Sequence, residues 1–281
     1  MSNIKIRKFD PSKIDPCRTC VFIAKKNCGK STLIKDILYH QRKIPLGVVM
    51  SGTEASNEHY GSFVPDSFIY GKYEPDVIKK VLTNQEKIVS KMTKAEKENF
   101  KDPSRSIFLV MDDCMFDNKW TRDDNMRCIF MNGRHYRIFF MLAMQYCMDL
   151  PPALRTNIDY LFVLKENIIQ NREKIYKNFF GIFPDFDTFN EVLSLCTENY
   201  ECLVLDNSST SSKIEDCVFW YKAKKNTDFK IGSPAMWQHH KLHYSPNGDN
   251  NEQNEPKKKK KNTITVTKTD SEGKMKRVIK S

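Results

Sequence analysis

The chain has 281 residues, of which 40% are apolar, and a formal net charge of +11 at pH 7. That is enough apolar material for the buried core of one large α/β domain or two small domains. Since no apolar run approaches the ~18 residues of a membrane span, and residues 1–9 lack the apolar stretch of a secretory signal, we expect a soluble cytosolic protein with no membrane span.

Strands and helices are predicted to alternate along most of the chain. Short apolar runs indicate buried strands, and apolar residues three and four apart indicate helices. The predicted strands are 20–24, 46–51, 106–111, 137–144, 160–164, 201–205 and 218–222, the last two forming a closing pair. The predicted helices are 30–41, 75–92, a Lys/Glu-rich segment ending at 101, 123–131, 168–180 and 186–197.

Successive strand–helix units of this length favour an α/β fold in which a largely parallel sheet carries helices on both faces. Ligands of such sheets bind outside the carboxyl ends of the strands. Residues 1–245 are predicted to form this domain, and residues 246–281 a disordered basic tail. We find no internal repeat in the sequence.

Residues 21–32, VFIAKKNCGKST, have the pattern of a strand that leads through a phosphate-binding loop into a helix. Such a loop needs backbone N–H groups around the phosphates, a lysine at the β and γ phosphates and a hydroxyl on Mg²⁺. Lys30 and Ser31 supply the last two, whereas Ala24 stands where the full G-x-x-x-x-G-K-[ST] pattern has glycine. The residues predicted to cradle the nucleotide are Ala24, Lys25, Lys26, Asn27, Cys28, Gly29, Lys30, Ser31 and Thr32.

The apolar run 107–111 ends in two aspartates, which is the Walker B pattern. Asp112, at the carboxyl end of a buried strand, is predicted to hold Mg²⁺ opposite Ser31. Asp113 stands where many ATPases place the carboxylate that polarises the attacking water, so we assign it as the general base. The alternative is a strand that ends in a turn with helix-capping acids.

The spacing of these motifs bears on the type of nucleotide-binding enzyme. Lys30 and Asp112 lie 82 positions apart, which leaves room for a strand and a helix and favours an ATPase with an inserted strand over a compact kinase. A GTPase would carry Asp-x-x-Gly after this strand, but no glycine occurs among the five residues after Asp113. The predicted cofactors are therefore ATP and Mg²⁺.

Gln145 follows the predicted strand 137–144, where a glutamine can sense the γ-phosphate or orient water; the alternative is an ordinary turn residue.

An arginine finger would stabilise the charge on the transferred phosphoryl group. The candidates are Arg127, Arg134, Arg137 and Arg155. We favour Arg134, because it comes just before the strand of Gln145, and then Arg155; each can equally be a surface arginine.

The basic charge is concentrated at the C-terminus. Residues 257–281 contain ten Lys or Arg and two acids, a net +8, whereas residues 1–256 contain 36 and 33, a net +3. The lysine run Lys257–Lys261 follows a polar stretch that cannot form a core. It is typical of a nucleic-acid contact or a nuclear-import signal, or of a solvated tail that aids solubility.

The nine cysteines are an odd number and are scattered through predicted strands and helices, which indicates reduced thiols in a reducing compartment. Cys17 and Cys20 form a C-x-x-C pair, but no second pair completes a zinc set. We interpret them as buried or incidental thiols, with a metal site as the alternative.

Five fragments in order resemble the poxvirus-type DNA-packaging ATPases of large nucleocytoplasmic DNA viruses, members of the FtsK-HerA superfamily. They are AKKNCGKST, FLVMDD, NGRHYRI, MLAMQY and DLPPALRTNIDYLFVL. The resemblance covers roughly residues 18–222 and leaves 223–281 uncovered. It implies an additional-strand P-loop ATPase that works as a homo-oligomeric ring and drives double-stranded DNA, without sequence specificity, into a capsid.

By this resemblance, Lys30 and Ser31 hold phosphate and Mg²⁺, and Asp112 and Asp113 are the Walker B pair. Gln145 becomes the sensor, and Arg134 or Arg155 acts across a subunit boundary. Two departures are Ala24 for the first loop glycine and Asp113 where many relatives of the wider superfamily carry glutamate.

The resemblance also implies a partner, a capsid or portal-like viral protein, and a location in viral factories of the host cytoplasm and in the virion, with the basic tail allowing nuclear entry. Two alternatives remain open. The chain could be another P-loop NTPase or helicase acting on nucleic acid, although it is short for a second RecA-like domain. It could also be a nucleic-acid-binding virion protein whose nucleotide site has decayed.

Overall fold

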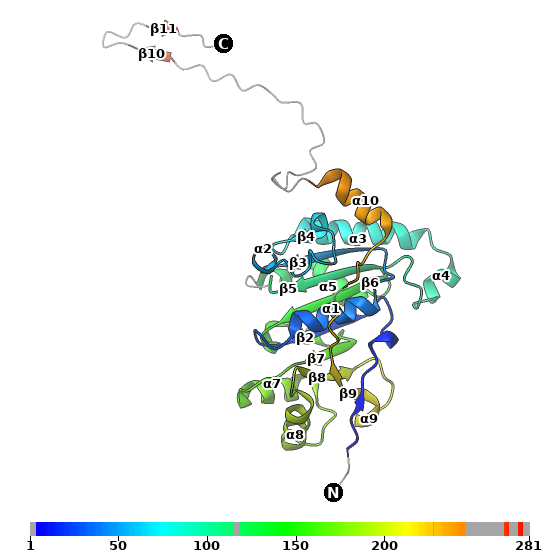
Figure 1. Ribbon diagram of the computed structural model, residues 1–281. Coiled ribbons are helices and arrows are strands. Elements are labelled where there is room, and N and C mark those ends of the chain that lie inside the picture. Colours follow the sequence, from blue (N-terminus) through cyan, green and yellow to red (C-terminus); the bar gives the residue numbers. More distant parts are fainter. Residues whose placement is uncertain (1–3, 115–117, 227, 245–266, 270–274, 278–281) are drawn as a thin grey trace. The chain divides into compact units, whose positions relative to one another are not determined.

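Nine strands form a single sheet at the centre of the molecule (Figure 1). The computed structural model describes residues 4–114, 118–226, 228–244, 267–269 and 275–277. The sheet lies in the first of two units into which the chain divides, Met1–Tyr244 and Ser245–Ser281. Its strands are β1 (Arg7–Lys8), β2 (Thr19–Ile23), β3 (Leu46–Ser51), β4 (Ile69–Tyr70), β5 (Ile107–Asp112), β6 (Ile138–Met144), β7 (Tyr160–Val163), β8 (Glu201–Asp206) and β9 (Val218–Lys222).

The strand order is β1-β9-β8-β7-β2-β6-β5-β3-β4. Strand β8 runs antiparallel to both of its neighbours, and the other pairs are parallel. The predicted closing pair of strands is thus confirmed as β8 and β9. Strand β6 lies between β2 and β5, so the predicted inserted strand is also confirmed. Because the central strands are parallel, the loops that follow β2, β5 and β6 share one edge of the sheet.

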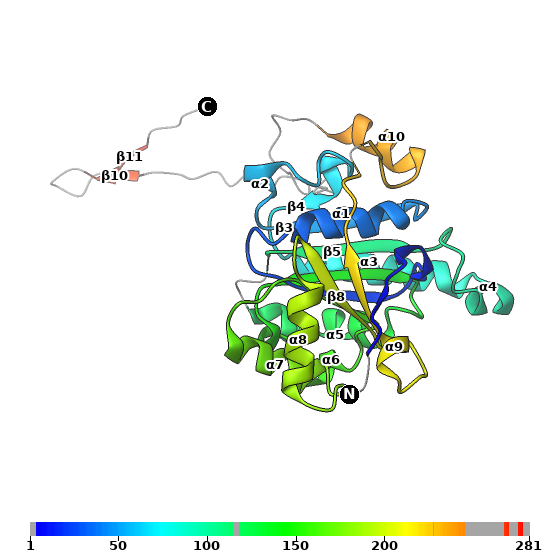
Figure 2. The same ribbon diagram turned by 60° about the horizontal axis from the view of Figure 1, so that its bottom comes forward.

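Helices cover both faces of this sheet. Their bounds are α1 (Lys30–His40), α2 (Glu54–Asn57), α3 (Pro75–Ser90), α4 (Lys94–Glu98), α5 (Asp124–Asn132), α6 (Pro152–Arg155), α7 (Ile169–Phe179), α8 (Phe186–Cys196), α9 (Ile214–Cys217) and α10 (Pro234–His243). In Figure 2, α1 lies on one side of the sheet and α5, α6 and α8 lie on the other. The structure therefore confirms the α/β class with a largely parallel sheet.

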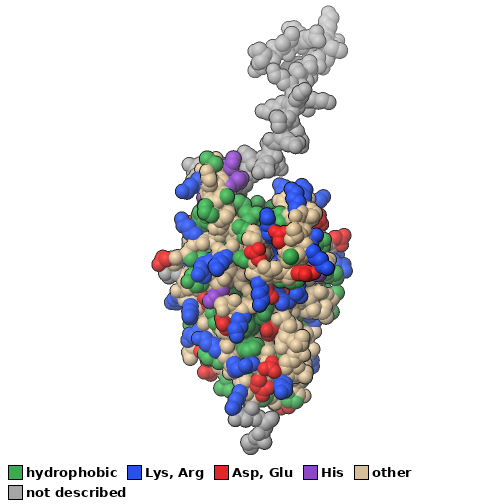
Figure 3. Space-filling model, turned by 90° about the vertical axis from the view of Figure 1, so that its right-hand side faces the viewer, with side chains coloured by type: hydrophobic (Ala, Val, Ile, Leu, Met, Phe, Trp, Pro, Cys, Tyr) green, Lys and Arg blue, Asp and Glu red, His purple; other side chains and the backbone are tan. Residues whose placement is uncertain are grey.

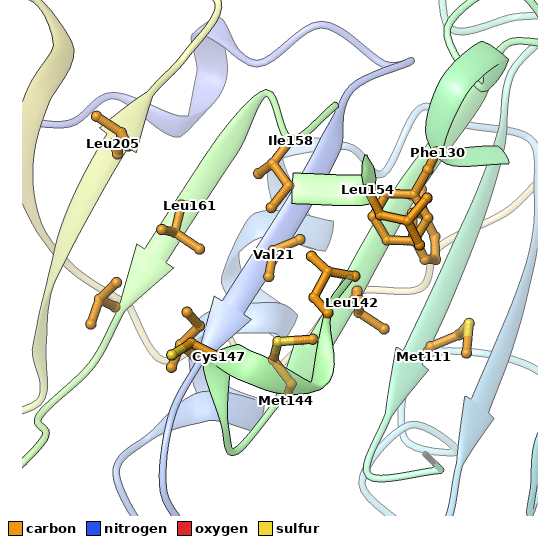
Figure 4. Packing of buried hydrophobic residues seen from close by; sticks show 14 of the residues in the cluster. Val21, Met111, Phe130, Leu142, Met144, Cys147, Leu154, Ile158, Leu161 and Leu205 are labelled. Atoms are coloured by element: carbon orange, nitrogen blue, oxygen red, sulfur yellow. The ribbon is translucent and has the colours of Figure 1, made fainter. Parts of the chain in front are cut away.

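Two hydrophobic clusters divide between these faces. Leu33, Ile34 and Ile37 of α1 pack against Phe22 of β2 in one cluster. Residues of α3, α5, α6, α7 and α8 pack against the other face. Figure 4 shows this second cluster, in which Leu154 and Ile158 lie over Val21, Leu142 and Leu161 of neighbouring strands. Along the central strands, side chains alternate between the two clusters, as expected where a sheet is buried on both faces.

Most predicted elements agree with the observed ones to within two residues, and the differences have local causes. The Lys/Glu-rich helix is predicted to end at residue 101, whereas α4 ends at Glu98. The two-residue strands β1 and β4 are too short to show an alternating pattern, and α10 has only one buried side chain, Met236. These elements were not predicted.

Arg137, predicted to begin a strand, instead precedes β6 with a left-handed φ of 58°. Its guanidinium is buried and donates to the main-chain carbonyl of Asn99 at 2.7 Å, to that of Lys97 at 3.0 Å and to that of Glu96. These carbonyls belong to the end of α4 and the residue that follows it, where helices leave acceptors unpaired. Arg137 therefore attaches α4 to the amino edge of the sheet.

Replacing Arg137 with alanine should lower the free energy of unfolding by about 2–3 kcal/mol, because three main-chain carbonyls lose a charged donor. Urea unfolding measures the change. Arg134→Ala is the matched control, because the Arg134 guanidinium is exposed and lies over the ring of Phe100, 4.2 Å from its centroid. Equal stability of the two variants would contradict this role of Arg137.

In the second unit the structure describes two short strands, β10 (Thr267–Thr269) and β11 (Met275–Arg277), which pair antiparallel. The lysine run Lys257–Lys261 lies outside the described residues. The disorder predicted for residues 246–281 stays a prediction.

Candidate nucleotide site

The segment between β2 and α1 has the backbone of a phosphate-binding loop. Asn27 and Gly29 have left-handed φ values of 63° and 91°, and the N–H of Leu33 donates to the carbonyl of Gly29 at 3.0 Å, within the first turn of α1. The first N–H groups of a helix have no partner within it, so they can bind an anion. Ala24 is buried and is not among the residues with positive φ, so this position does not need glycine.

Three charged side chains meet directly beside this loop. The Nζ of Lys30 lies 2.9 Å from Oδ1 of Asp112 and 2.6 Å from Oδ1 of Asp113. Lys30 is only 7% exposed and Asp112 only 2%. Burial alone would lower the pKa of Lys30, but the two carboxylates reverse this and raise it above its usual value. The structure thus brings together the predicted phosphate-binding lysine and both predicted Walker B acids.

Asp112 is fixed by a contact that the sequence did not indicate. The hydroxyl of Tyr60 donates to Oδ2 of Asp112 at 2.8 Å, in the interior of the protein. Burial and the neighbouring carboxylate raise the pKa of Tyr60 well above its usual value, so the phenol remains a donor. No local pattern predicts this pair, because the two residues lie 52 positions apart.

The donor set at this edge fits a hard cation such as Mg²⁺. Oδ1 of Asp112 is buried and, within the described part of the chain, accepts no well-aligned hydrogen bond, although Lys30 is close. Ser51, the register partner of Asp112 on β3, also has a buried hydroxyl without a hydrogen bond there. Carboxylate and hydroxyl oxygens are the ligands that Mg²⁺ prefers. Ser31, in the first turn of α1, is the predicted second ligand.

Asp113 has a strained backbone, with a left-handed φ of 49°. Its side chain accepts from Lys30 and also from Nε2 of Gln145, at 3.3 Å. The chain passes so close here that a Cβ on Gly52 would lie 2.4 Å from the Asp113 carbonyl oxygen, which only glycine avoids. Strain of this kind persists where surrounding contacts hold it. Gln145 therefore lies beside the predicted general base.

The other side of the phosphate-binding loop is tied to the segment after β7. Nζ of Lys25 forms an ion pair of 2.5 Å with Oε1 of Glu166, which is buried. Burial would raise the pKa of Glu166, but its bonds to Lys25 and to the N–H of Ile168 lower it. Sγ of Cys28 lies 3.8 Å from the carbonyl oxygen of Lys165. The predicted loop residues are thus fixed from both sides.

The tyrosines that follow β3 contact other parts of the fold through their side chains. Tyr60 holds Asp112, and Tyr70 packs partly buried against the cluster on the α3 face. The Tyr73 hydroxyl donates to Oδ2 of Asp123 at 2.6 Å. Next to Tyr60, Nε2 of His59 lies 3.2 Å from the carbonyl oxygen of Ser31. The segment after β3 therefore contacts the site through its buried side chains.

The finger candidates lie away from this cluster of charges. Arg134 is in the turn before β6, at the amino edge of the sheet, and the seven residues of β6 separate it from Gln145. Arg155 donates through Nε to the Leu150 carbonyl at 2.7 Å and also contacts Asn178. Arg127 is exposed on α5. Within one subunit the structure does not bring any of them to Lys30.

All nine cysteines lie in the described part of the chain and are free thiols. Cys17 and Cys20 are buried, and burial raises the pKa of Cys17 to about 11. Among the described residues, no group of three or more His, Cys, Asp or Glu is arranged to hold a metal ion. In the described ranges, no helix is long and apolar enough to span a membrane.

Comparison with known proteins agrees with this geometry. The sequence pattern of the family described as Poxvirus A32 protein matches residues 13–226. An uncharacterized protein of Acanthamoeba polyphaga mimivirus is 39% identical over 249 residues, covering 87% of this chain and 86% of its own. An uncharacterized protein of invertebrate iridescent virus 6 is 32% identical over 253 residues, covering 85% and 95%.

Solved structures share the fold. The genome packaging NTPase B204 from Sulfolobus turreted icosahedral virus 2, in complex with AMP, superposes with a TM-score of 0.53 and 16% identity, covering 75% of this chain and 100% of its own. The DNA-packaging ATPase B204 from Sulfolobus turreted icosahedral virus has a TM-score of 0.51 and 17% identity, with the same coverage. At this identity the likeness shows the fold.

Burial holds the pKa of His59 below its usual 6.5, so an NMR titration of the ring should give a value under 6.5. His59 is then protonated more readily in the unfolded chain than in the folded one. The contribution of neutral His59 to the free energy of unfolding therefore falls as the pH drops from about 7 toward 5. His59→Gln should show a smaller loss of unfolding free energy over this range. An identical loss in the variant would refute the assignment.

Proposed function

We propose that this chain, which belongs to the poxvirus A32 protein family, hydrolyses ATP to move double-stranded DNA during the packaging of a viral genome. The observation that carries the proposal is the meeting of Lys30, Asp112, Asp113 and Gln145 at one edge of the sheet. A phosphate-binding loop without these partners would fit many enzymes. The packaging NTPase and ATPase that share the fold support this reaction and this substrate.

Hydrolysis would start when a triphosphate presents its anionic oxygens to Lys30 and to the N–H groups at the start of α1. Lys30 stays protonated, because its pKa is raised, and can transfer its contacts from Asp113 to phosphate. Asp113 then accepts a proton from the attacking water, which the amide of Gln145 orients.

Asp112 and Ser31 would hold Mg²⁺. When bound, the ion would neutralise charge on the phosphates. Tyr60 keeps one oxygen of Asp112 fixed at 2.8 Å while the other can face the ion. The shorter Asp113, at a position where many relatives of the wider superfamily carry glutamate, is brought within 2.6 Å of Lys30 by its left-handed backbone.

A homo-oligomeric ring would complete the site. Arg134 is our preferred finger, because its guanidinium is exposed and contacts only Phe100 among the interactions that the structure records for it. Arg155 contacts Leu150 and Asn178 of its own subunit, so it would have to give up these bonds first. About 20 Å of strand separates Arg134 from its own nucleotide edge, so it would act on the neighbouring subunit.

Contact with DNA would be electrostatic and independent of sequence. On the face in Figure 3, basic and acidic side chains are interspersed, so we expect the grip on DNA to come from a limited set of cations inside the ring. The basic tail at 246–281 would add affinity. We propose that this activity takes place in viral factories of the host cytoplasm, with a capsid or portal-like protein as partner. The virion and the nucleus are further proposed locations of the chain.

The substitution Lys30→Ala should lower the rate of ATP hydrolysis about 100-fold or more, because the developing charge on the phosphates loses a buried cation. The wild-type chain should hydrolyse ATP faster when double-stranded DNA is added. The release of inorganic phosphate measures the rate of the variant and the rate of the wild type with and without DNA. Normal turnover by Lys30→Ala would remove the central claim, and a lack of DNA stimulation would count against a translocase.

Removal of residues 246–281 is the control for the tail. A motor with this site should keep its ATPase activity, whereas a binding protein with a decayed nucleotide site should have none to keep and should lose nearly all DNA affinity. The same truncation therefore separates the proposed motor from the alternative of a virion protein held by its basic tail.

Tyr60→Phe should raise the Mg²⁺ concentration for half-maximal ATP hydrolysis about 10-fold, since Asp112 loses a charge-assisted hydrogen bond. Tyr73→Phe is the matched control, because it deletes a similar tyrosine–aspartate bond away from Lys30. Titration with Mg²⁺ at saturating ATP separates the two. An equal Mg²⁺ requirement in both variants would show that Tyr60 has a packing role only.

A further inference from the structure

We propose that Tyr200 forms a wall of the subsite for the nucleoside part of the nucleotide, with its ring stacked on the base. This inference rests on the proposed function, because it names what binds next to the phosphate-binding loop. Two tyrosines of the segment after β3 already have other contacts: Tyr60 is buried against Asp112, and Tyr73 is bonded to Asp123.

The order of strands fixes the direction in which a nucleotide would lie. The predicted base Asp113 and its partner Gln145 follow β5 and β6, on one side of the loop strand β2. Strands β7 and β8 lie on the other side of β2. If the terminal phosphate faces Asp113, the nucleoside must extend away from it, past Gly29 and toward the loops at the ends of β7 and β8.

Tyr200 lies on that side. It immediately precedes β8, whose first residue is at the same edge of the sheet as the carboxyl end of β7, because the two strands are antiparallel. A Cβ built on Gly29 would lie 3.3 Å from Cδ1 of Tyr200, so the tyrosine ring is in contact with the phosphate-binding loop itself.

The ring is in contact with the loop but is not part of the core. Tyr200 is 71% exposed, which leaves most of its surface open for a flat ligand. Aromatic side chains stack on bases through their π faces, and this attraction is tolerant of base identity. The expected ligand class is therefore a nucleoside triphosphate, with affinity that depends more on the presence of a base than on which base it is.

The turn that holds this exposed ring has a strained backbone. Asn199 and Tyr200 both have left-handed φ values, 50° and 63°, which side chains other than glycine rarely adopt. The turn is closed by the N–H of Glu201, which donates to the carbonyl of Glu198 at 2.8 Å. Such strain clusters at ligand sites. Here it places an aromatic ring against the loop without burying it.

Neighbouring contacts extend the same wall. Lys25 is paired with Glu166, and Cys28 contacts the Lys165 carbonyl, both from the segment after β7. Residues 165–166 and Tyr200 thus lie along the side of the loop that faces away from Asp113. The proposed ribose and base would lie against this side of the loop.

Calorimetric titration of the full chain with two probes, ATP and inorganic triphosphate, tests the inference. Tyr200→Ala should weaken ATP binding about 10-fold and leave inorganic triphosphate binding unchanged, because only ATP carries a base. Tyr200→Phe should bind ATP like the wild type, since it keeps the ring. Leu195→Ala is the matched control, because Leu195 is 72% exposed on the preceding helix α8.

Unchanged ATP affinity in Tyr200→Ala, while the wild type binds both probes, would overturn this inference and leave the proposed function standing. An equal loss for ATP and inorganic triphosphate would overturn it too, because Tyr200 would then support the loop and not the base. A wild-type chain that binds neither probe would overturn the proposed function, and this inference with it.

Discussion

The contact of Lys30 with Asp112 and Asp113 is the interaction on which the site depends. Lys30 begins α1, the two aspartates stand at the end of β5, and the parallel sheet brings them to one edge. Two adjacent carboxylates, one of them buried, would repel each other without a cation between them. The lysine that we propose to bind phosphate therefore also stabilises the two acids beside it.

The contacts around this cluster show how the rest of the fold serves it. Tyr60, from the segment after β3, fixes Asp112, and Gln145, from the end of β6, contacts Asp113. On the other side of the loop, Glu166 holds Lys25. These partners come from strands on both sides of β2. A displacement of those strands would therefore change the contacts that hold the phosphate-binding loop.

The opposite edge of the sheet has a different character. Arg137 is buried and attaches α4 through main-chain carbonyls, whereas Arg134, three residues earlier, is exposed. Both arginines were finger candidates in the sequence, with Arg134 favoured for its place just before the strand of Gln145. Burial separates them: the Arg137 guanidinium is held in place by three main-chain carbonyls at the end of α4, whereas the Arg134 side chain is exposed.

The sequence by itself determined the alternation of strands and helices, the phosphate-binding loop and the acids after β5. These are local patterns, set by apolar periodicity and by short motifs. Only the tertiary structure decided that Tyr60 meets Asp112, that Glu166 meets Lys25 and that Tyr200 lies against Gly29. Those pairs join residues far apart in the chain, and their contacts depend on strand order and on strained turns, which carry no pattern that a single sequence reveals.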